Sequence, residues 1–238
     1  MNKIKLLIII MLFAVASSVM GQVNDVYDKT KMYDYILEAD QILSECKDYE
    51  SYKSVYQELI SGYSAMGANM VVDYLRRLPH LEYLEANSDQ VNEMMNIAEF
   101  YNRTKIGCKA ADIQCLTIND KEFDLNQIRT KYTIVLFWSY SCPHCRSLIY
   151  ELADLVEDYN DIALVTVNVS GDLKQVKRLL KKAGLKNGNN ICDGKGWDSQ
   201  IVDNYAVDMT PSMFLLDEEK IIIAKPFDVD DIVNSIEL

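Results

Sequence analysis

The stretch from Tyr132 to Cys145 reads YTIVLFWSYSCPHC and carries the strongest structural signal in the chain. Its first half, residues 132–138, is an unbroken run of β-branched, aromatic and other apolar side chains, as expected of a strand buried on both faces. Its second half ends in two cysteines separated by Pro143 and His144. A helix is expected to begin here, because the missing N–H of a proline would have had no partner in the first helical turn.

Strands and helices alternate after this stretch. Residues 162–168 (IALVTVN) predict a second buried strand, and residues 173–183 predict a helix. A strand, helix and strand in this order imply a parallel βαβ unit. After a longer irregular stretch, residues 212–216 and 221–225 predict an antiparallel hairpin, and residues 228–237 predict a closing helix. We therefore expect a central mixed sheet with helices on both faces.

The chain before this region has a helical pattern. Apolar residues recur at helical spacing in four segments: 32–46, 52–63, 70–78 and 91–101. This predicts a small all-α bundle over residues 22–104, followed by an α/β domain over residues 105–238.

The first residues have the composition of a secretory signal peptide. Lys3 and Lys5 precede an apolar run over residues 6–16, and small or apolar residues precede Gln22. The run is shorter than the roughly 20 apolar residues that span a bilayer, and no cysteine follows it where a lipoprotein would need one. We expect residues 1–21 to be removed and the product to be exported, to a bacterial periplasm. An uncleaved membrane anchor is the alternative.

The overall composition limits the classes of partner. The 238 residues are 49% apolar, as in globular proteins, and the length suits two modest domains. Lys and Arg total 24 against 36 Asp and Glu, a net charge of −12, which disfavours nucleic acid as a partner. The basic cluster over residues 174–182 is interpreted as a solvated helix face.

The cysteine pair carries the candidate chemistry. At a helix N-terminus, free backbone N–H groups and the macrodipole stabilise the thiolate of Cys142. Two intervening residues bring the sulfurs of Cys142 and Cys145 close enough to cycle between dithiol and disulfide, and His144 can add positive charge and a hydrogen bond beside Cys142. Zinc needs four ligands, and the sequence has no second cysteine pair, so no metal and no cofactor are expected.

The other four cysteines have no assigned task. Cys46 lies on a helical stripe and is expected to be a buried apolar residue. Cys108 and Cys115 can pair only if the chain turns back between them, because seven extended residues separate them by about 23 Å. Cys192 is either a free thiol or a regulatory partner.

The chain resembles the thioredoxin superfamily over residues 107–238. FWSYSCPHC, residues 137–145, is similar to that family's active-site stretch, and Met209-Thr210-Pro211 is similar to its cis-proline loop. The spacing between Cys145 and Pro211 (211 − 145 = 66 residues) resembles the TlpA/ResA type of exported thiol-disulfide oxidoreductase. Leu136 occupies the place of the buried aspartate of thioredoxin.

The resemblance implies a thioredoxin-like α/β fold and a set of site residues. It assigns catalysis to the redox-active pair, with Cys142 as nucleophile and Cys145 as resolving thiol, assisted by Pro143 and His144. It assigns substrate contacts to Trp138, Thr210 and Pro211, with a cis bond before Pro211.

The expected activity is thiol-disulfide exchange with protein thiols and disulfides, with a membrane redox partner that recycles the pair. The Pro-His dipeptide is typical of DsbA-type oxidants, whereas the architecture is typical of reductases, so the direction stays open, as does the oligomeric state. One alternative is a partner-binding module with a structural or sensing disulfide. Another is a peroxiredoxin-like peroxidase, although Val135 occupies the place of the proline in the peroxiredoxin signature.

Overall fold

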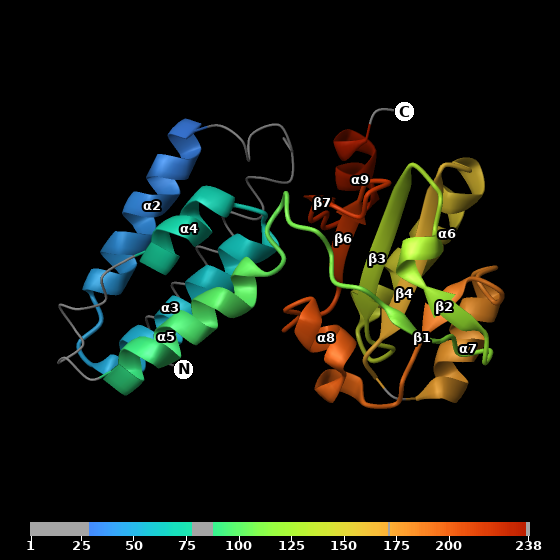
Figure 1. The fold of residues 1–238 in the computed structure, drawn as a ribbon, viewed down its shortest axis with the longest axis horizontal. Helices are drawn as coiled ribbons and strands as arrows, with labels where there is room; N and C mark the ends of the chain where they lie inside the picture. The colour runs from blue at the N-terminus through green and yellow to red at the C-terminus, as the bar shows by residue number, and fades with distance from the viewer. Residues whose placement is uncertain (1–28, 78–87, 171, 237–238) are drawn as a thin grey trace. The chain divides into compact units, whose positions relative to one another are not determined.

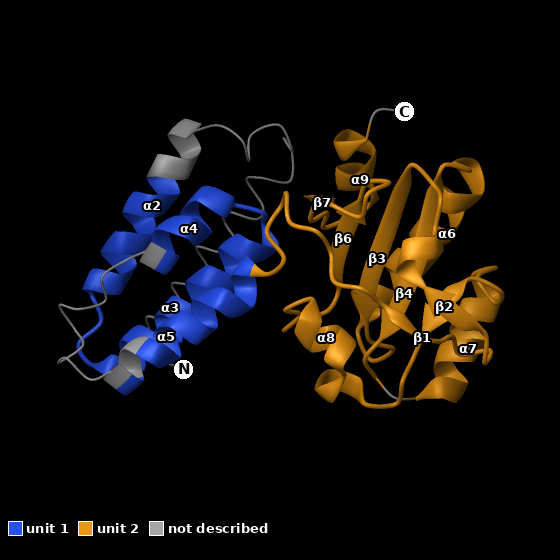
Figure 2. Cartoon of the chain, in the orientation of Figure 1, with its two compact units in different colours: residues 1–102 blue, residues 103–238 orange. Residues whose placement is uncertain are grey.

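The computed structural model describes residues 29–77, 88–170 and 172–236. The predicted signal peptide over residues 1–21 lies outside the described residues. The chain divides into two compact units, residues 1–102 and residues 103–238, as Figure 2 shows. Sequence reasoning placed this division between residues 104 and 105.

Unit 1 is a bundle of helices, as predicted. Its described helices are α2 (Lys29–Ser44), α3 (Tyr49–Ala65), α4 (Asn69–Arg77) and α5 (Ser88–Asn102). Helix α3 begins after Asp48, whose carboxylate accepts the N–H of Ser51 at 2.8 Å, while the Ser51 hydroxyl accepts the N–H of Asp48 at 3.3 Å. The bundle core consists of apolar residues spaced three and four apart, including Tyr56, Leu59, Ile60, Val71, Val72, Leu75, Met94 and Ala98.

Unit 2 contains one sheet of five strands and one of two (Figure 1). Its strands are β1 (Gln114–Leu116), β2 (Glu122–Asp124), β3 (Tyr132–Trp138), β4 (Ile162–Asn168), β5 (Asn189–Ile191), β6 (Ser212–Leu216) and β7 (Ile222–Ala224). Its α-helices are α6 (Pro143–Asp158), α7 (Leu173–Lys182), α8 (Gln200–Asn204) and α9 (Val229–Ser235), and short 3₁₀ turns cover Leu125–Gln127 and Gly196–Asp198.

The larger sheet has the order β5-β4-β3-β6-β7. Strand β3 is central, pairing in parallel with β4 and antiparallel with β6. All seven residues of β3 are buried, which explains why its sequence is apolar without alternation. The mixed sheet, both long strands and the β6–β7 hairpin are confirmed.

Two separate cores flank this sheet, because successive side chains of a strand point to opposite faces. Ile134, Leu136 and Trp138 of β3 pack in one core with apolar residues of α6, α7 and α9. Val135 and Phe137 pack in the other, which α8 and the β1–β2 hairpin help to cover. The cysteine pair belongs to the first face, at the start of α6.

Some elements were missed by sequence reasoning. The stretch expected to be irregular before β6 contains β5 and α8, and the β1–β2 hairpin was not predicted. Each strand has only three residues, too few to establish a pattern, and tertiary contacts hold them. For example, the N–H of Ile118, after β1, donates to the carbonyl of Asn190 in β5 at 2.8 Å. The closing helix is also shorter than predicted, ending at Ser235.

No helix in the described ranges is both long and apolar enough to cross a membrane.

Candidate active site

The first cysteine caps a helix. Cys142 precedes α6 in extended conformation, and Pro143 occupies the first helical turn, as predicted. The Cys142 sulfur accepts the backbone N–H of Cys145 at 3.2 Å. This N–H is one of the unpaired donors of a helix N-terminus, so negative charge on Cys142 is stabilised there by a hydrogen bond and by the helix dipole.

The second cysteine is inaccessible. Cys145 has no exposed surface, whereas Cys142 is half-buried. Burial, with a further contribution from Cys142, raises the pKa of Cys145 from 9.0 to about 11. The folded reduced protein therefore holds the Cys145 proton more tightly than the unfolded chain does. This contribution to the free energy of unfolding is fully present below about pH 9 and is lost as the pH rises toward 11. The second thiol is thus both inaccessible and harder to ionise than a free cysteine.

A distant loop lies against the first cysteine. The Thr210–Pro211 peptide bond is cis, as the resemblance implied. The carbonyl oxygen of Thr210 lies 3.7 Å from the Cys142 sulfur and accepts from that thiol. Thr210 and Pro211 are both half-buried, so part of this loop remains open to solvent beside the sulfur.

His144 does not have the expected contact with Cys142. Among the hydrogen bonds of the described residues, none joins these two side chains. The imidazole stacks instead on the ring of Phe227, with centroids 5.4 Å apart and planes inclined by 23°. Phe227 is 56% exposed, so the pair forms an aromatic surface at the start of α6. The reason is the helical spacing, because residues two positions apart in a helix do not face each other.

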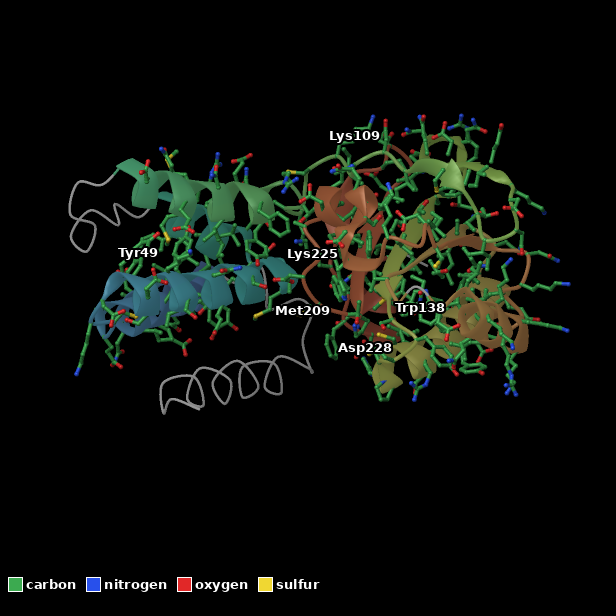
Figure 3. All side chains as sticks on the ribbon, turned by 90° about the horizontal axis from the view of Figure 1, so that it is seen from below. Tyr49, Lys109, Trp138, Met209, Lys225 and Asp228 are labelled. Carbon is green, nitrogen blue, oxygen red and sulfur yellow. The ribbon has the colours of Figure 1, made fainter. Side chains whose placement is uncertain are left out.

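Trp138 does not lie where a substrate could contact it, contrary to expectation. Sequence reasoning assigned it to substrate contacts, but its side chain is completely buried in the core that α6 helps to form. Figure 3 labels Trp138 among the side chains of unit 2. Its indole N–H has no hydrogen-bond partner among the described residues. No part of the ring is available to a substrate, and we assign Trp138 to the core that supports the cysteine loop.

Arg146 was not predicted, although it contacts the loop before Cys142. Its guanidinium donates to the carbonyl of Tyr140 at 2.9 Å and lies 5.7 Å from the centre of the Tyr140 ring. The Tyr140 N–H donates in turn to the hydroxyl of Ser170, after β4, at 3.3 Å. The available sequence signal was the position of Arg146 one helical turn after Cys142; no comparable signal pointed to Phe227.

Three of the remaining cysteines belong to three different cores. Cys46 is buried in the helical core, which raises its pKa. Cys115 and Cys192 pack on opposite faces of the sheet, in different cores. All six cysteines are free thiols in this structure. The described residues contain no cluster of three or more His, Cys, Asp or Glu side chains able to hold a metal ion.

These differences predict an order of alkylation. At about pH 8, iodoacetamide should modify Cys142 well before Cys145 in the reduced protein. A pKa raised from 9.0 to about 11 lowers the thiolate fraction on the order of a hundredfold, in addition to the protection by burial. Fragmentation mass spectrometry of the labelled peptide distinguishes the two sites. Equal labelling of both cysteines in the folded protein would contradict the geometry, and labelling in urea provides the control.

Comparison with known proteins places this geometry in a family. The model of the AhpC/TSA family matches residues 106–225. A thioredoxin-like protein from Bacteroides caccae aligns with a TM-score of 0.54 and 14% identity, over 88% of this chain and 83% of its own. The C-terminal domain of a provisionally assigned thiol-disulfide oxidoreductase from Bacteroides thetaiotaomicron aligns with a TM-score of 0.50 and 19% identity, over 56% of this chain and 93% of its own.

No curated protein matches the chain. Because the two solved structures are less than 25% identical to this chain, they show its fold alone, which is thioredoxin-like in unit 2. Because the family model covers half of the sequence and includes β3, the cysteine pair and the cis-proline loop, the chain belongs to the AhpC/TSA family.

Proposed function

We propose that this protein is a thiol-disulfide oxidoreductase that exchanges disulfides with protein substrates through Cys142 and Cys145. The observation that carries the proposal is the contrast within the pair. Cys142 is half-buried at a helix N-terminus beside the Thr210 carbonyl, and Cys145 is wholly buried three residues later. One thiol is therefore suited to meet a substrate, and the other can react only with its neighbour.

The exchange has two steps in the reducing direction. The Cys142 thiolate attacks one sulfur of a substrate disulfide; a new S–S bond forms, and the other substrate sulfur leaves as a thiolate and takes a proton. Cys145 then loses its proton and attacks the Cys142 sulfur, so the internal disulfide forms and the second substrate thiolate leaves. Two electrons pass from the cysteine pair to the substrate, and an external dithiol must return them. We assign that role to a membrane redox partner.

The cis-proline loop is proposed to hold the substrate. Thr210 and Pro211 are partly exposed next to Cys142, and an extended substrate segment can pair with backbone groups there. Pro143 stiffens the turn that carries the nucleophile.

The position of His144 favours the reducing direction. An imidazolium hydrogen-bonded to Cys142 would stabilise the reduced pair and make the disulfide strongly oxidising. In this structure the imidazole stacks on Phe227, which leaves the N–H of Cys145 and the helix dipole to stabilise a Cys142 thiolate. We therefore propose a reductase, which acts outside the cytoplasm after removal of residues 1–21.

The reduction potential tests this direction. Equilibrated with glutathione buffers, the Cys142–Cys145 pair should have a potential nearer the roughly −270 mV of thioredoxin than the roughly −120 mV of DsbA. Titration of the thiols by mass spectrometry gives the value. A potential near that of DsbA would make the protein an oxidant instead.

The same preparation distinguishes the alternative functions. Reduction of insulin with dithiothreitol as electron source supports the oxidoreductase, whereas no turnover would leave a binding module with a sensing disulfide. Consumption of hydroperoxide that is faster than insulin reduction would indicate a peroxidase.

Export is tested separately, because the secreted chain should begin at Gln22 when its N-terminus is determined by mass spectrometry.

A further inference from the structure

Helix α7 carries a stripe of positive charge that the proposed function does not use. Its apolar side chains, Val176, Leu179 and Leu180, are buried in the core beside α6. Every cation of the helix is exposed, and their spacing of three and four residues places them along one solvent-facing stripe. We call this set the α7 stripe; it consists of Lys174, Lys177, Arg178, Lys181 and Lys182.

The stripe is unusual in this acidic chain. Residues 172–188 contain six Lys or Arg and one acid, a net charge of +5, whereas the whole chain has 24 and 36, a net charge of −12. The other residues therefore carry 24 − 6 = 18 basic and 36 − 1 = 35 acidic groups, a net charge of −17. Like charges three and four residues apart destabilise a helix, and the ion pairs of the described residues include no member of the stripe. An ordinary solvated face would mix the two signs.

The stripe begins four residues after Ser170, which contacts the loop before Cys142. Helix α7 starts after Asp172, which caps it by accepting the N–H of Gln175 at 3.1 Å. Two residues earlier, Ser170 accepts the N–H of Tyr140, which lies two residues before Cys142. Helices α6 and α7 contribute to the same core on one face of the sheet. A partner bound at Cys142 would thus have the start of the stripe nearby.

We propose that the α7 stripe is a docking surface for an acidic patch on the protein substrate, placed beside the cysteine that reacts with Cys142. The inference rests on the proposed function. The five positive charges of the stripe are complementary to an acidic surface, and this indicates the kind of partner. A membrane surface is the weaker occupant for two reasons. The apolar face of α7 is already buried, so it cannot enter the headgroup region, and the acidic remainder of the chain would be repelled by an extended anionic plane. A protein can present a local acidic patch instead.

Electrostatic docking of this kind acts on the association rate and weakens with salt. The test uses three peptides that carry the same thionitrobenzoate mixed disulfide on a cysteine flanked by glutamates, glutamines or lysines. The second-order rate constant of thionitrobenzoate release is measured with the reduced chain from Gln22 to Leu238. The background from the other thiols is measured with Cys142→Ser and subtracted.

The wild-type protein should react faster with the glutamate peptide than with the lysine peptide, despite its overall negative charge. In the triple variant Lys174→Gln, Lys177→Gln, Lys181→Gln, the ratio of the rate constants for the glutamate and lysine peptides should fall about tenfold. About half-molar salt should abolish the preference of the wild-type protein. A matched variant, Lys47→Gln, Lys109→Gln, Lys121→Gln, removes the same charge from exposed positions outside α7 and should keep the preference. Equal losses in both variants would overturn the proposal, because net charge alone would then explain the effect.

Two further outcomes separate the possible failures. If the glutamine peptide is not reduced at all, the proposed function fails. Docking is then tested by fluorescence anisotropy with a serine version of the glutamate peptide, and loss of its binding in the α7 variant alone still supports the stripe. If the α7 variant instead loses binding to vesicles containing phosphatidylglycerol while its peptide preference is unchanged, the partner is a membrane and the protein-docking proposal is overturned.

Discussion

Cys142→Ser should lower the rate of insulin reduction by at least about a thousandfold, since a serine hydroxyl cannot replace the thiolate in disulfide exchange. The rate is followed by turbidity of the released insulin chain, with dithiothreitol as electron donor. The fold should be unchanged, because Cys142 is only half-buried and serine can still accept the N–H of Cys145 at the helix start.

Cys145→Ala should give a different defect. The first step still occurs, but the buried thiol that would release the substrate is missing, so a mixed disulfide with Cys142 accumulates. Non-reducing electrophoresis detects this complex, and Cys192→Ala is the matched control that should not trap substrate. Trapping through any other cysteine in the Cys142→Ser background would refute the assignment of roles.

Trp138→Ala should destabilise unit 2 by about 3–5 kcal/mol, the cost of removing a large buried aromatic side chain. The ring is wholly enclosed beneath the start of α6, so the cavity that remains cannot fill without moving the helix that carries the cysteine pair. The free energy of unfolding is measured with urea, following the far-ultraviolet circular dichroism.

Trp138→Phe is the matched variant, and it should cost less than about 1.5 kcal/mol. It keeps most of the ring volume and removes an N–H that lacks a partner among the described residues, so no hydrogen bond is lost. Both variants should retain exchange activity while folded. A folded Trp138→Phe protein with normal stability but greatly weakened substrate affinity would instead return Trp138 to the substrate-binding residues.

The long buried elements could be predicted because their residues carry the signal themselves. The apolar runs at residues 132–138 and 162–168 became β3 and β4 with the expected bounds, since burial on both faces leaves no alternation to misread. The start of α6 was equally local, because Cys142 and Pro143 suit a capping position and a first turn. Strand β5 was missed because three residues have no readable pattern and depend on pairing with β4.

The sequence by itself determined that two cysteines stand at a strand-to-helix junction, because strand propensity, proline and helix capping are all local. Only the tertiary structure decided what surrounds them. The Thr210 carbonyl contacts the Cys142 sulfur although the two residues are 68 positions apart in the sequence. The imidazole of His144 stacks on Phe227 instead of contacting that sulfur. Trp138 is buried because its place in β3 directs it toward α6. These contacts depend on how the sheet brings distant segments together, and no local preference of the residues involved encodes that arrangement.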